Sequence, residues 1–259
     1  MELNGVPADR IQLSALAMTN YGHFTTMRVA DGRVRGLSLH LERLSRDCRI
    51  VFGTDLDTER VRYLIRHALG ERKGAATVRV TVFDPALELA HPGAAAEPHL
   101  LVTTRPAPAE ALSPMRVQAA RYVRERPEVK HVGLFGTIDR RRRAQLAGFD
   151  DVLFIDERSF VAEGATWNVG FFDGEHLVWP RAKVLPGVTM ALLNEVHGGP
   201  VRTDPVPLRQ LPGMGAAFAT NAGVGVRAIS AVDGVGFAEA HPILDVLRKE
   251  YADIPAQPL

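Results

Sequence analysis

Strand-type and helix-type patterns follow one another irregularly along this chain. Residues 76–83 alternate in the manner of a half-buried strand, and two helical patterns precede them. Ser38 can cap the first of these helices, which Gly53 ends, and the second spans residues 58–69. A doubly wound parallel sheet needs a regular strand–helix–strand repeat, which the sequence lacks. We therefore expect an α+β fold with two lobes.

A proline-rich stretch marks the boundary between the two expected lobes. Residues 106–114 include three prolines and break the pattern of strands and helices. They predict an interdomain linker between a small N-terminal α+β domain, residues 1–105, and a larger C-terminal α+β domain, residues 115–259. A chain of 259 residues is long enough for this division.

The second domain is expected to mix short strands with three helices. The helical patterns cover residues 137–147, 189–196 and 242–250, and the strand patterns cover 115–122, 152–155, 160–162, 167–172, 216–220 and 226–232.

Composition and charge exclude several classes of function. The formal net charge is +1, which gives no overall attraction to nucleic acid or to an anionic membrane. No apolar run approaches the ~20 residues that span a bilayer, and the first residues lack a signal-peptide pattern. The single cysteine, Cys48, and nine scattered histidines predict neither a disulfide framework nor a metal site. We expect a cytoplasmic globular protein.

Three charged residues are candidates for chemistry, although each also has a simpler interpretation. Lys130 has largely apolar neighbours, which suits a lysine that reacts as a neutral amine, but it also suits a surface lysine near a strand end. Glu163 follows an apolar strand and precedes a glycine, as a turn carboxylate or a cofactor-binding group would. Arg43 lies three residues after His40, on one helix face that could be a solvated basic stripe.

The order of five segments favours the chemical interpretation of these residues over the simpler one. They are F-T-T-M-R-V-A-D-G from Phe24, V-K-H around Lys130, V-A-E-G-A-T-W-N-V-G around Glu163, L-P-G-V-T from Leu185 and A-T-N-A-G-V-G from Ala219. In this order and at these spacings the chain resembles the fold-type IV pyridoxal-phosphate (PLP) enzymes. That family includes D-amino acid aminotransferase, branched-chain aminotransferase and 4-amino-4-deoxychorismate lyase.

The resemblance implies roles for individual residues. Lys130 matches the lysine that binds PLP covalently and then moves the proton of the substrate Cα. Glu163 matches the carboxylate that pairs with the pyridine nitrogen, and Arg43 matches the arginine that binds the phosphate. Val188 and Thr189, at the start of a helix, match the groups that bind the phosphate at the positive end of the helix dipole.

The chain also departs from the family pattern. Ala222 stands where family members often have a phosphate-binding threonine. Either the backbone amides of the Thr220–Gly223 loop, which includes Asn221, make this contact instead, or the cofactor is retained less well. Met190 replaces an arginine of many transaminases, and Phe135 replaces a tyrosine near the cofactor. Arg124 and Arg126 could supply a cationic group instead, but a solvated strand end is the expected place for both.

The resemblance leaves the reaction open between two subgroups. We expect a class IV aminotransferase that acts on a small amino acid and a 2-keto acid. The F-T-T-x-R-V block and the K-H pair match the lyase subgroup best, so the alternative is the lyase type of β-elimination, which releases pyruvate from an amino-cyclohexadiene substrate. A second alternative is a non-catalytic member, which the loss of the threonine at Ala222 would explain.

Substrate binding and assembly are also implied only by the resemblance. The candidate substrate-binding residues are Tyr21, His23, Thr25, Arg28 and Trp167. An arginine would bind a substrate carboxylate, and an apolar pocket would accept an aliphatic side chain. The family also implies a homodimer.

Overall fold

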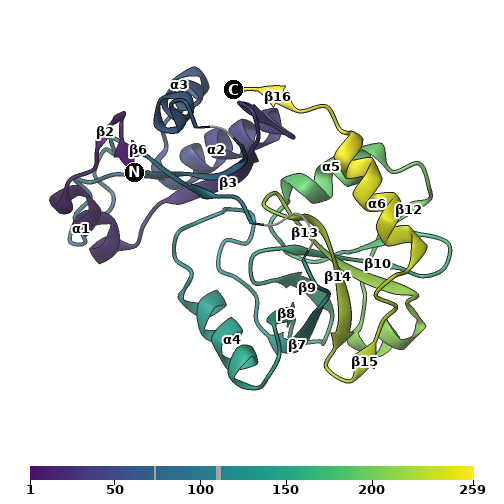
Figure 1. Cartoon of the computed structure of the whole chain (residues 1–259). Helices are drawn as coiled ribbons and strands as arrows, with labels where there is room; N and C mark the ends of the chain where they lie inside the picture. The colour runs from purple at the N-terminus through teal and green to yellow at the C-terminus, as the bar shows by residue number, and fades with distance from the viewer. Residues whose placement is uncertain (73, 109–111) are drawn as a thin grey trace. The chain divides into compact units, whose positions relative to one another are not determined.

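The computed structural model describes residues 1–72, 74–108 and 112–259 (Figure 1). Contacts along the backbone group the chain into two units. Unit 1 comprises Met1–Pro108, Val129–Gly133 and Pro255–Leu259, and unit 2 comprises Ala109–Glu128 and Leu134–Ile254. Residues 109–111 of the predicted linker lie outside the described residues.

Lys130 belongs to unit 1 in this grouping, whereas the sequence pattern places it in the C-terminal domain. The reason is a pair of backbone hydrogen bonds between the short segment Val129–Gly133 and the chain before residue 25. Phe24 N–H donates to the Lys130 carbonyl at 2.8 Å, and Val132 N–H donates to the Gly22 carbonyl at 2.9 Å. The sequence predicts one crossing between the two domains, at the linker 106–114. In the grouping by contacts the chain instead returns to unit 1 twice, at Val129–Gly133 and at Pro255–Leu259.

Unit 1 contains a five-stranded sheet with the order β2-β1-β6-β5-β3. Its strands are β1 (Glu2–Leu3), β2 (Val6–Pro7), β3 (His23–Val29), β5 (Ala76–Phe83) and β6 (His99–Pro106). A two-stranded sheet joins β4 (Arg33–Val34) to β16 (Gln257–Pro258) near the end of the chain. All pairings in the two sheets are antiparallel.

Strand β5 is buried on both faces, so the expectation of a half-buried strand was wrong. It lies between β3 and β6, and Arg79 is its only residue that is not buried. The polar side of the strand packs against its own neighbours: the Arg79 guanidinium lies 3.6 Å from the centroid of the Phe24 ring, and its Nε donates to Thr81. Alternation in the sequence cannot distinguish such a strand from one with a solvated face.

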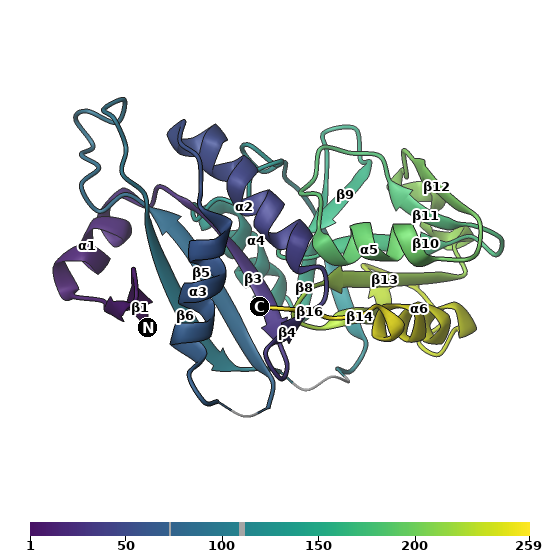
Figure 2. The same cartoon turned by 90° about the horizontal axis from the view of Figure 1, so that it is seen from above.

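Three helices belong to unit 1: α1 (Arg10–Thr19), α2 (Leu37–Phe52) and α3 (Thr58–Leu69). Helices α2 and α3 lie side by side on one face of the sheet and enclose an apolar core with β3, β5 and β6 (Figure 2). Helix α2 begins at Leu37, two residues earlier than a cap at Ser38 predicts, and Ser38 does not cap it with its side chain. The Ser38 N–H instead donates to Gln257 Oε1, so a residue 219 positions away completes this helix end.

Unit 2 is built on a nine-stranded sheet whose middle closes on itself. Eight strands follow the order β12-β11-β10-β13-β14-β7-β8-β9, and the ninth, β15, pairs with β14. Strand β9 also pairs with β10, which closes a ring of six strands. The strands of unit 2 are β7 (Met115–Arg121), β8 (Asp151–Ile155), β9 (Val161–Gly164), β10 (Asn168–Phe172), β11 (Leu177–Pro180), β12 (Val201–Asp204), β13 (Ala216–Asn221), β14 (Gly225–Val232) and β15 (Val235–Gly236). The largest apolar core takes side chains from all six ring strands.

The helices of unit 2 cover different parts of this sheet. Helix α4 (Phe135–Leu146) packs on β7 and β8, whereas α5 (Val188–Val196) and α6 (Pro242–Asp253) pack on β13 and β14. A short 3₁₀ helix, η1, spans Leu208–Gly213. The mixture of strands and helices without a regular repeat confirms the predicted α+β class.

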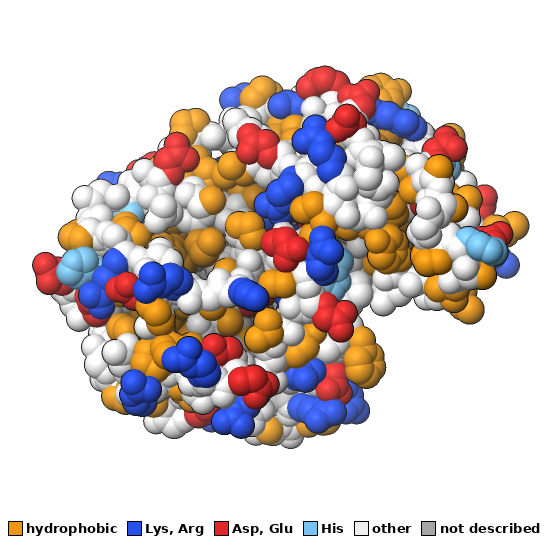
Figure 3. Space-filling view, turned by 180° about the vertical axis from the view of Figure 1, so that it is seen from behind, with side chains coloured by type: hydrophobic (Ala, Val, Ile, Leu, Met, Phe, Trp, Pro, Cys, Tyr) orange, Lys and Arg blue, Asp and Glu red, His pale blue; other side chains and the backbone are white. Residues whose placement is uncertain are grey.

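The described residues contain no helix that is both long and apolar enough to span a bilayer. On the face in Figure 3, cationic and anionic side chains are interspersed, in keeping with a formal net charge of +1.

Candidate active site

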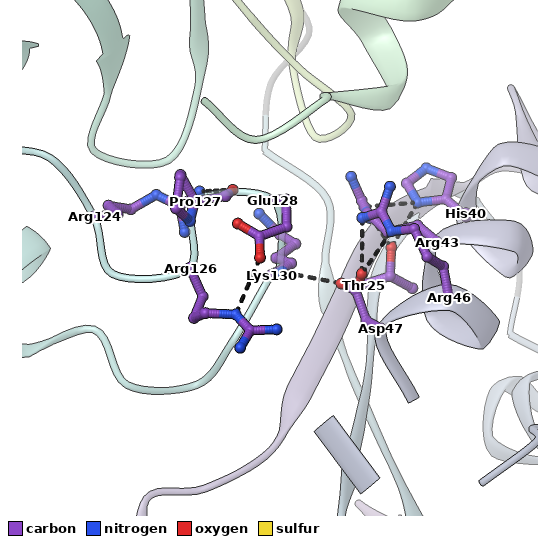
Figure 4. A network of polar contacts seen from close by, with 10 residues as sticks. All are labelled: Thr25, His40, Arg43, Arg46, Asp47, Arg124, Arg126, Pro127, Glu128 and Lys130. Atoms are coloured by element: carbon purple, nitrogen blue, oxygen red, sulfur yellow. Dashed lines mark hydrogen bonds and ion pairs between the residues drawn. The ribbon is translucent and has the colours of Figure 1, made fainter. Parts of the chain in front are cut away.

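Unit 1 holds Lys130 by its main chain on both sides. The carbonyl accepts from Phe24 N–H of β3, and the N–H donates to Asp47 Oδ2 of α2 at 2.9 Å (Figure 4). The side chain is half-buried, and its Nζ lies 5.0 Å from the centroid of the Phe24 ring. A cation near an aromatic face is stabilised by the ring quadrupole, so Phe24 contacts both the backbone and the amine of Lys130.

Arg43, Thr25 and His40 form a buried chain of hydrogen bonds next to this segment. Arg43 Nη2 donates to Thr25 Oγ1 at 2.7 Å, and Thr25 Oγ1 lies 2.7 Å from His40 Nδ1 (Figure 4). A hydroxyl that accepts from Arg43 can donate to His40 Nδ1, which places the proton of the neutral imidazole on Nε2. That Nε2 and the Nε of Arg43 are buried without a hydrogen-bond partner among the described residues.

Burial and nearby charge set the protonation of these groups. Burial lowers the pKa of Arg43 to about 10, and the carboxylate of Asp47 opposes this effect. Arg43 therefore stays charged at neutral pH. Burial also lowers the pKa of His40 well below its usual range, and the charges of Arg43 and Lys130 lower it further. His40 is thus a neutral support for an arginine that keeps its charge.

In unit 2, Glu163 lies near the end of β9 in a buried ion pair. Arg124 Nε lies 2.8 Å from Glu163 Oε1, and each side chain is about 7% exposed. The other oxygen, Oε2, accepts from Leu185 N–H at 3.1 Å. Arg124 Nη2 donates in turn to the Pro127 carbonyl. The carboxylate is therefore held in orientation at both oxygens.

Arg124 corrects an expectation from the sequence. Arg124 and Arg126 were both expected at a solvated strand end, but only Arg126 is exposed, and it pairs with Glu128 at 3.0 Å. Arg124 is 8% exposed because its guanidinium pairs with Glu163, which is 39 residues away in the sequence. A local pattern cannot reveal that pairing.

The start of α5 brings Val188 and Thr189 together as a candidate anion site. Both residues are buried, and the hydroxyl of Thr189 has no hydrogen-bond partner among the residues described. The N-cap is Gly187, which makes no side-chain cap to the helix. A Cβ at Gly187 would collide with Asn168 Oδ1, so glycine is needed where this loop approaches β10.

The loop after β13 carries Asn221 and Ala222, which are both half-buried. Asn221 Oδ1 accepts from Gly223 N–H at 2.9 Å and from Val224 N–H at 3.0 Å. Its side chain therefore shapes the turn. A role of the loop in binding a phosphate stays a prediction.

Trp167 is 6% exposed, and its indole N–H donates to Asp151 Oδ2 at 2.9 Å. Its ring packs so closely on Gly164 that a Cβ there would collide with it. Trp167 and Asn221 line one cavity of about 250 Å³ in unit 2, together with Arg141, Asp151 and other residues. Contact of Trp167 with a substrate stays a prediction.

The other substrate candidates lie in unit 1. Tyr21 is 46% exposed, and its hydroxyl donates to the Val51 carbonyl at 3.0 Å. Arg28 Nη1 donates to the Pro108 carbonyl at 3.0 Å. Thr25 and His23 are fully buried, and the contacts of Thr25 assign it to the support of Arg43. The roles of these residues in substrate binding stay predictions.

Two residues that support the candidate groups of unit 1, His40 and Asp47, were not predicted from the sequence, whereas Arg124 of unit 2 was considered but expected at a solvated strand end. His40 had a signal, because it shares a helix face with Arg43 at a spacing of three residues. Asp47 lies four residues after Arg43 on the same helix. From the sequence alone, a carboxylate at this position is interpreted as an ordinary surface charge. No group of three or more His, Cys, Asp or Glu within the described ranges is placed to hold a metal ion.

Comparison with known proteins identifies the family of this chain. The family model described as amino-transferase class IV matches residues 22–232. A probable branched-chain-amino-acid aminotransferase of Rickettsia bellii is 30% identical over 125 residues, which cover 45% of this chain and 43% of that protein. The corresponding protein of Rickettsia typhi is 25% identical over 253 residues, covering 89% of this chain and 86% of that one.

Solved structures share the fold over nearly the whole chain. A branched-chain aminotransferase of Thermoproteus uzoniensis, with norvaline, has a TM-score of 0.88 at 18% identity and covers 97% of this chain and 92% of that one. A putative 4-amino-4-deoxychorismate lyase of Legionella pneumophila has a TM-score of 0.82 at 23% identity and covers 96% of both chains. Because the family model matches residues 22–232, most of this chain, the protein belongs to the class IV aminotransferases, the fold-type IV PLP enzymes.

Proposed function

We propose that this chain is a PLP-dependent aminotransferase that transfers an amino group between a small amino acid and a 2-keto acid. Family membership supports this reaction. The observation that carries the proposal is the hydroxyl of Thr189, which is buried at the start of α5 and has no hydrogen-bond partner among the described residues. Folding leaves such a donor unsatisfied at a cost, and an anion at the helix N-terminus would satisfy it.

The side chains of each unit fit PLP, which presents an aldehyde, a phosphate and a pyridine nitrogen. In unit 1, Arg43 has a charged guanidinium whose Nε has no described hydrogen-bond partner, and Lys130 supplies an amine. In unit 2, Thr189 and the first N–H groups of α5 would bind the phosphate, and the oriented Glu163 would accept from the pyridine nitrogen. The homodimer implied by the family resemblance is part of this proposal.

PLP, when bound, withdraws electrons from the substrate Cα and so makes its proton easier to remove. Lys130 Nζ would hold the cofactor and, once displaced by the substrate amine, would accept the Cα proton. Glu163, fixed by Arg124 and by Leu185 N–H, would keep the pyridine nitrogen protonated. Arg43 would hold the phosphate while the amine is exchanged, because its charge persists at neutral pH.

The lyase reaction is a second candidate, and a specific comparison favours it. The putative 4-amino-4-deoxychorismate lyase matches in length, since the alignment covers 96% of both chains. Its subgroup also shares the F-T-T-x-R-V block that begins at Phe24. A lyase would use Lys130, Glu163 and Arg43 for the same early steps and would then release pyruvate without a keto acid acceptor.

The test is the visible absorption spectrum of the purified protein with PLP, before and after a panel of D- and L-amino acids. Conversion to the pyridoxamine form with one set of donors supports transamination and gives its stereochemistry. Pyruvate release from an amino-cyclohexadiene substrate without a keto acid supports the lyase. A protein that binds no PLP contradicts both reactions and supports the non-catalytic alternative that Ala222 suggests.

Lys130→Ala is the matching variant, and Lys183→Ala is its control because Lys183 is an exposed lysine of unit 2. Loss of borohydride-fixed cofactor in Lys130→Ala alone is the expected result. Equal fixation in both variants would contradict the role of Lys130.

A further inference from the structure

The main chain of Lys130 is held by two different kinds of partner. On one side, its carbonyl accepts from Phe24 N–H at 2.8 Å, as neighbouring strands do. On the other side, its N–H donates at 2.9 Å to a side chain, the carboxylate of Asp47 in α2 (Figure 4). The position of the lysine backbone therefore depends on a helix as well as on a strand.

Asp47 is well suited to hold this position. Its side chain is fully buried, and its second oxygen, Oδ1, accepts from Arg46 Nη2 at 2.7 Å and from Arg46 Nε at 3.1 Å. A buried carboxylate is stable only when hydrogen bonds and opposite charge compensate its desolvation. The donors of Arg46 and Lys130 supply this compensation, and together they leave Asp47 little freedom to move.

The same helix carries Arg43, one turn before Asp47. Residues four apart lie on one face of a helix, so α2 presents the guanidinium and the carboxylate side by side. Arg43 is tied to β3 through Thr25, and Asp47 is tied to the lysine segment. One rigid helix thus sets the spacing between the Lys130 backbone and Arg43.

We propose that Asp47 is a positioning residue that fixes the Lys130 main chain to the helix carrying Arg43. In doing so it would set the distance between the amine that holds the cofactor and the arginine that holds its phosphate. This distance matters for catalysis only if the proposed function holds, so the inference rests on that function. The contact between Asp47 and Lys130 N–H itself lies within unit 1 and does not involve a cofactor.

The first test uses the cofactor-free protein and measures hydrogen exchange of the Lys130 amide in Asp47→Ala. Without the carboxylate, this N–H loses its acceptor, and its exchange should become roughly tenfold faster or more relative to the amides of β5. Cys48→Ala is the control for general loss of stability, because Cys48 is the next residue of α2 and is buried in the apolar core of unit 1. Unchanged protection of the Lys130 amide in Asp47→Ala would overturn the proposal.

The second test adds PLP and follows borohydride fixation of the cofactor to Lys130. Fixation in Asp47→Ala should be about tenfold slower than in the unmodified protein, and fixation in Asp55→Ala should be unchanged. Asp55 is the charge control, since it pairs with Arg49 of α2 at 2.6 Å but is exposed. Equal fixation rates in the Asp47 and Asp55 variants would contradict the proposal.

A third variant, Asp47→Asn, tests the same contact if the Asp47→Ala protein does not fold. Lys130 N–H and Arg46 approach different oxygens of Asp47, and asparagine replaces one of these oxygens by an NH₂ group. In the same orientation its remaining oxygen can therefore accept from only one of the two. Exchange and fixation rates between those of the unmodified protein and Asp47→Ala support the role of the carboxylate. If the unmodified protein fixes no PLP, the proposed function fails, whereas the exchange experiment still decides the contact of Asp47.

Discussion

At the scale of single residues, the unit 1 site combines charged groups with neutral histidines. His23 is fully buried in β3, and neither ring nitrogen has a hydrogen-bond partner in the described part of the chain. Burial lowers the pKa of His23 to about 3. The folded protein therefore resists protonation of this ring, whereas the unfolded chain takes up the proton near pH 6.5.

This difference predicts a pH dependence of stability. As the pH falls from about 6.5 towards 3, the unfolded chain binds a proton that folded His23 does not, so the free energy of unfolding should fall. The contribution of His23 is up to about 5 kcal/mol across this range and is constant above it. Urea unfolding at several pH values should show a shallower decline for His23→Leu than for the unmodified protein. Parallel declines would mean that folded His23 titrates normally.

Thr189 gives a second prediction at this scale. Thr189→Val removes the buried hydroxyl, which has no described protein partner, so stability should change little while PLP binds about tenfold more weakly. Thr189→Ser keeps the hydroxyl and should bind PLP as the unmodified protein does. Dissociation constants from absorption titrations would check both variants. Equal affinity in all three proteins would show that this hydroxyl does not contact the phosphate.

At the scale of elements, close packing between neighbouring strands fixes the candidate groups. Glu163 lies at the end of β9, and Gly164 N–H donates to the Trp167 carbonyl as the chain turns into β10. The Trp167 ring occupies the space where a side chain at residue 164 would lie. Packing therefore requires the glycine of the V-A-E-G segment.

Gly164→Ala should destabilise the protein by about 1–3 kcal/mol, because the new methyl group and the Trp167 ring cannot share that space. Gly198→Ala is the control, since a Cβ at Gly198 would meet no described atom within 4 Å. Chemical denaturation of both variants would measure the difference. A similar loss of stability in the two variants would contradict the packing argument.

At the scale of the whole molecule, the last residues of the chain complete unit 1, although the long segment before them belongs to unit 2. Gln257 and Pro258 pair with β4, and Gln257 Oε1 accepts from the first turn of α2. Leu259 N–H donates to the Gly32 carbonyl at 3.0 Å, and its side chain packs against the unit 1 core.

Removal of residues 255–259 should therefore destabilise unit 1 by roughly 1–3 kcal/mol, through a lost helix cap and lost apolar burial. Hydrogen exchange should rise at β4 and at the start of α2. The matched single variant is Gln257→Ala, which removes only the contact with Ser38 and should have a smaller effect. No change at α2 in the truncated protein would show that its start is held by other contacts.

The sequence determined the family and many of the elements, although helix α1 was not among those predicted. Helix 58–69 was predicted with its observed bounds, and Gly53 ends α2 in the left-handed conformation, because apolar spacing and glycine preferences are local properties. The five ordered segments were also sufficient to identify the family, and the match of the family model to residues 22–232 confirms it.

Only the tertiary structure decided which groups meet. The pairing of Arg124 with Glu163, the contact of Asp47 with Lys130 N–H and the hydrogen bond from Ser38 to Gln257 join residues that are 39, 83 and 219 positions apart. Such contacts leave no periodic pattern in the sequence, because they depend on how strands pair and helices pack. For the same physical reason, the burial of Arg124 and the assignment of Lys130 to unit 1 could not be read from their neighbours in the chain.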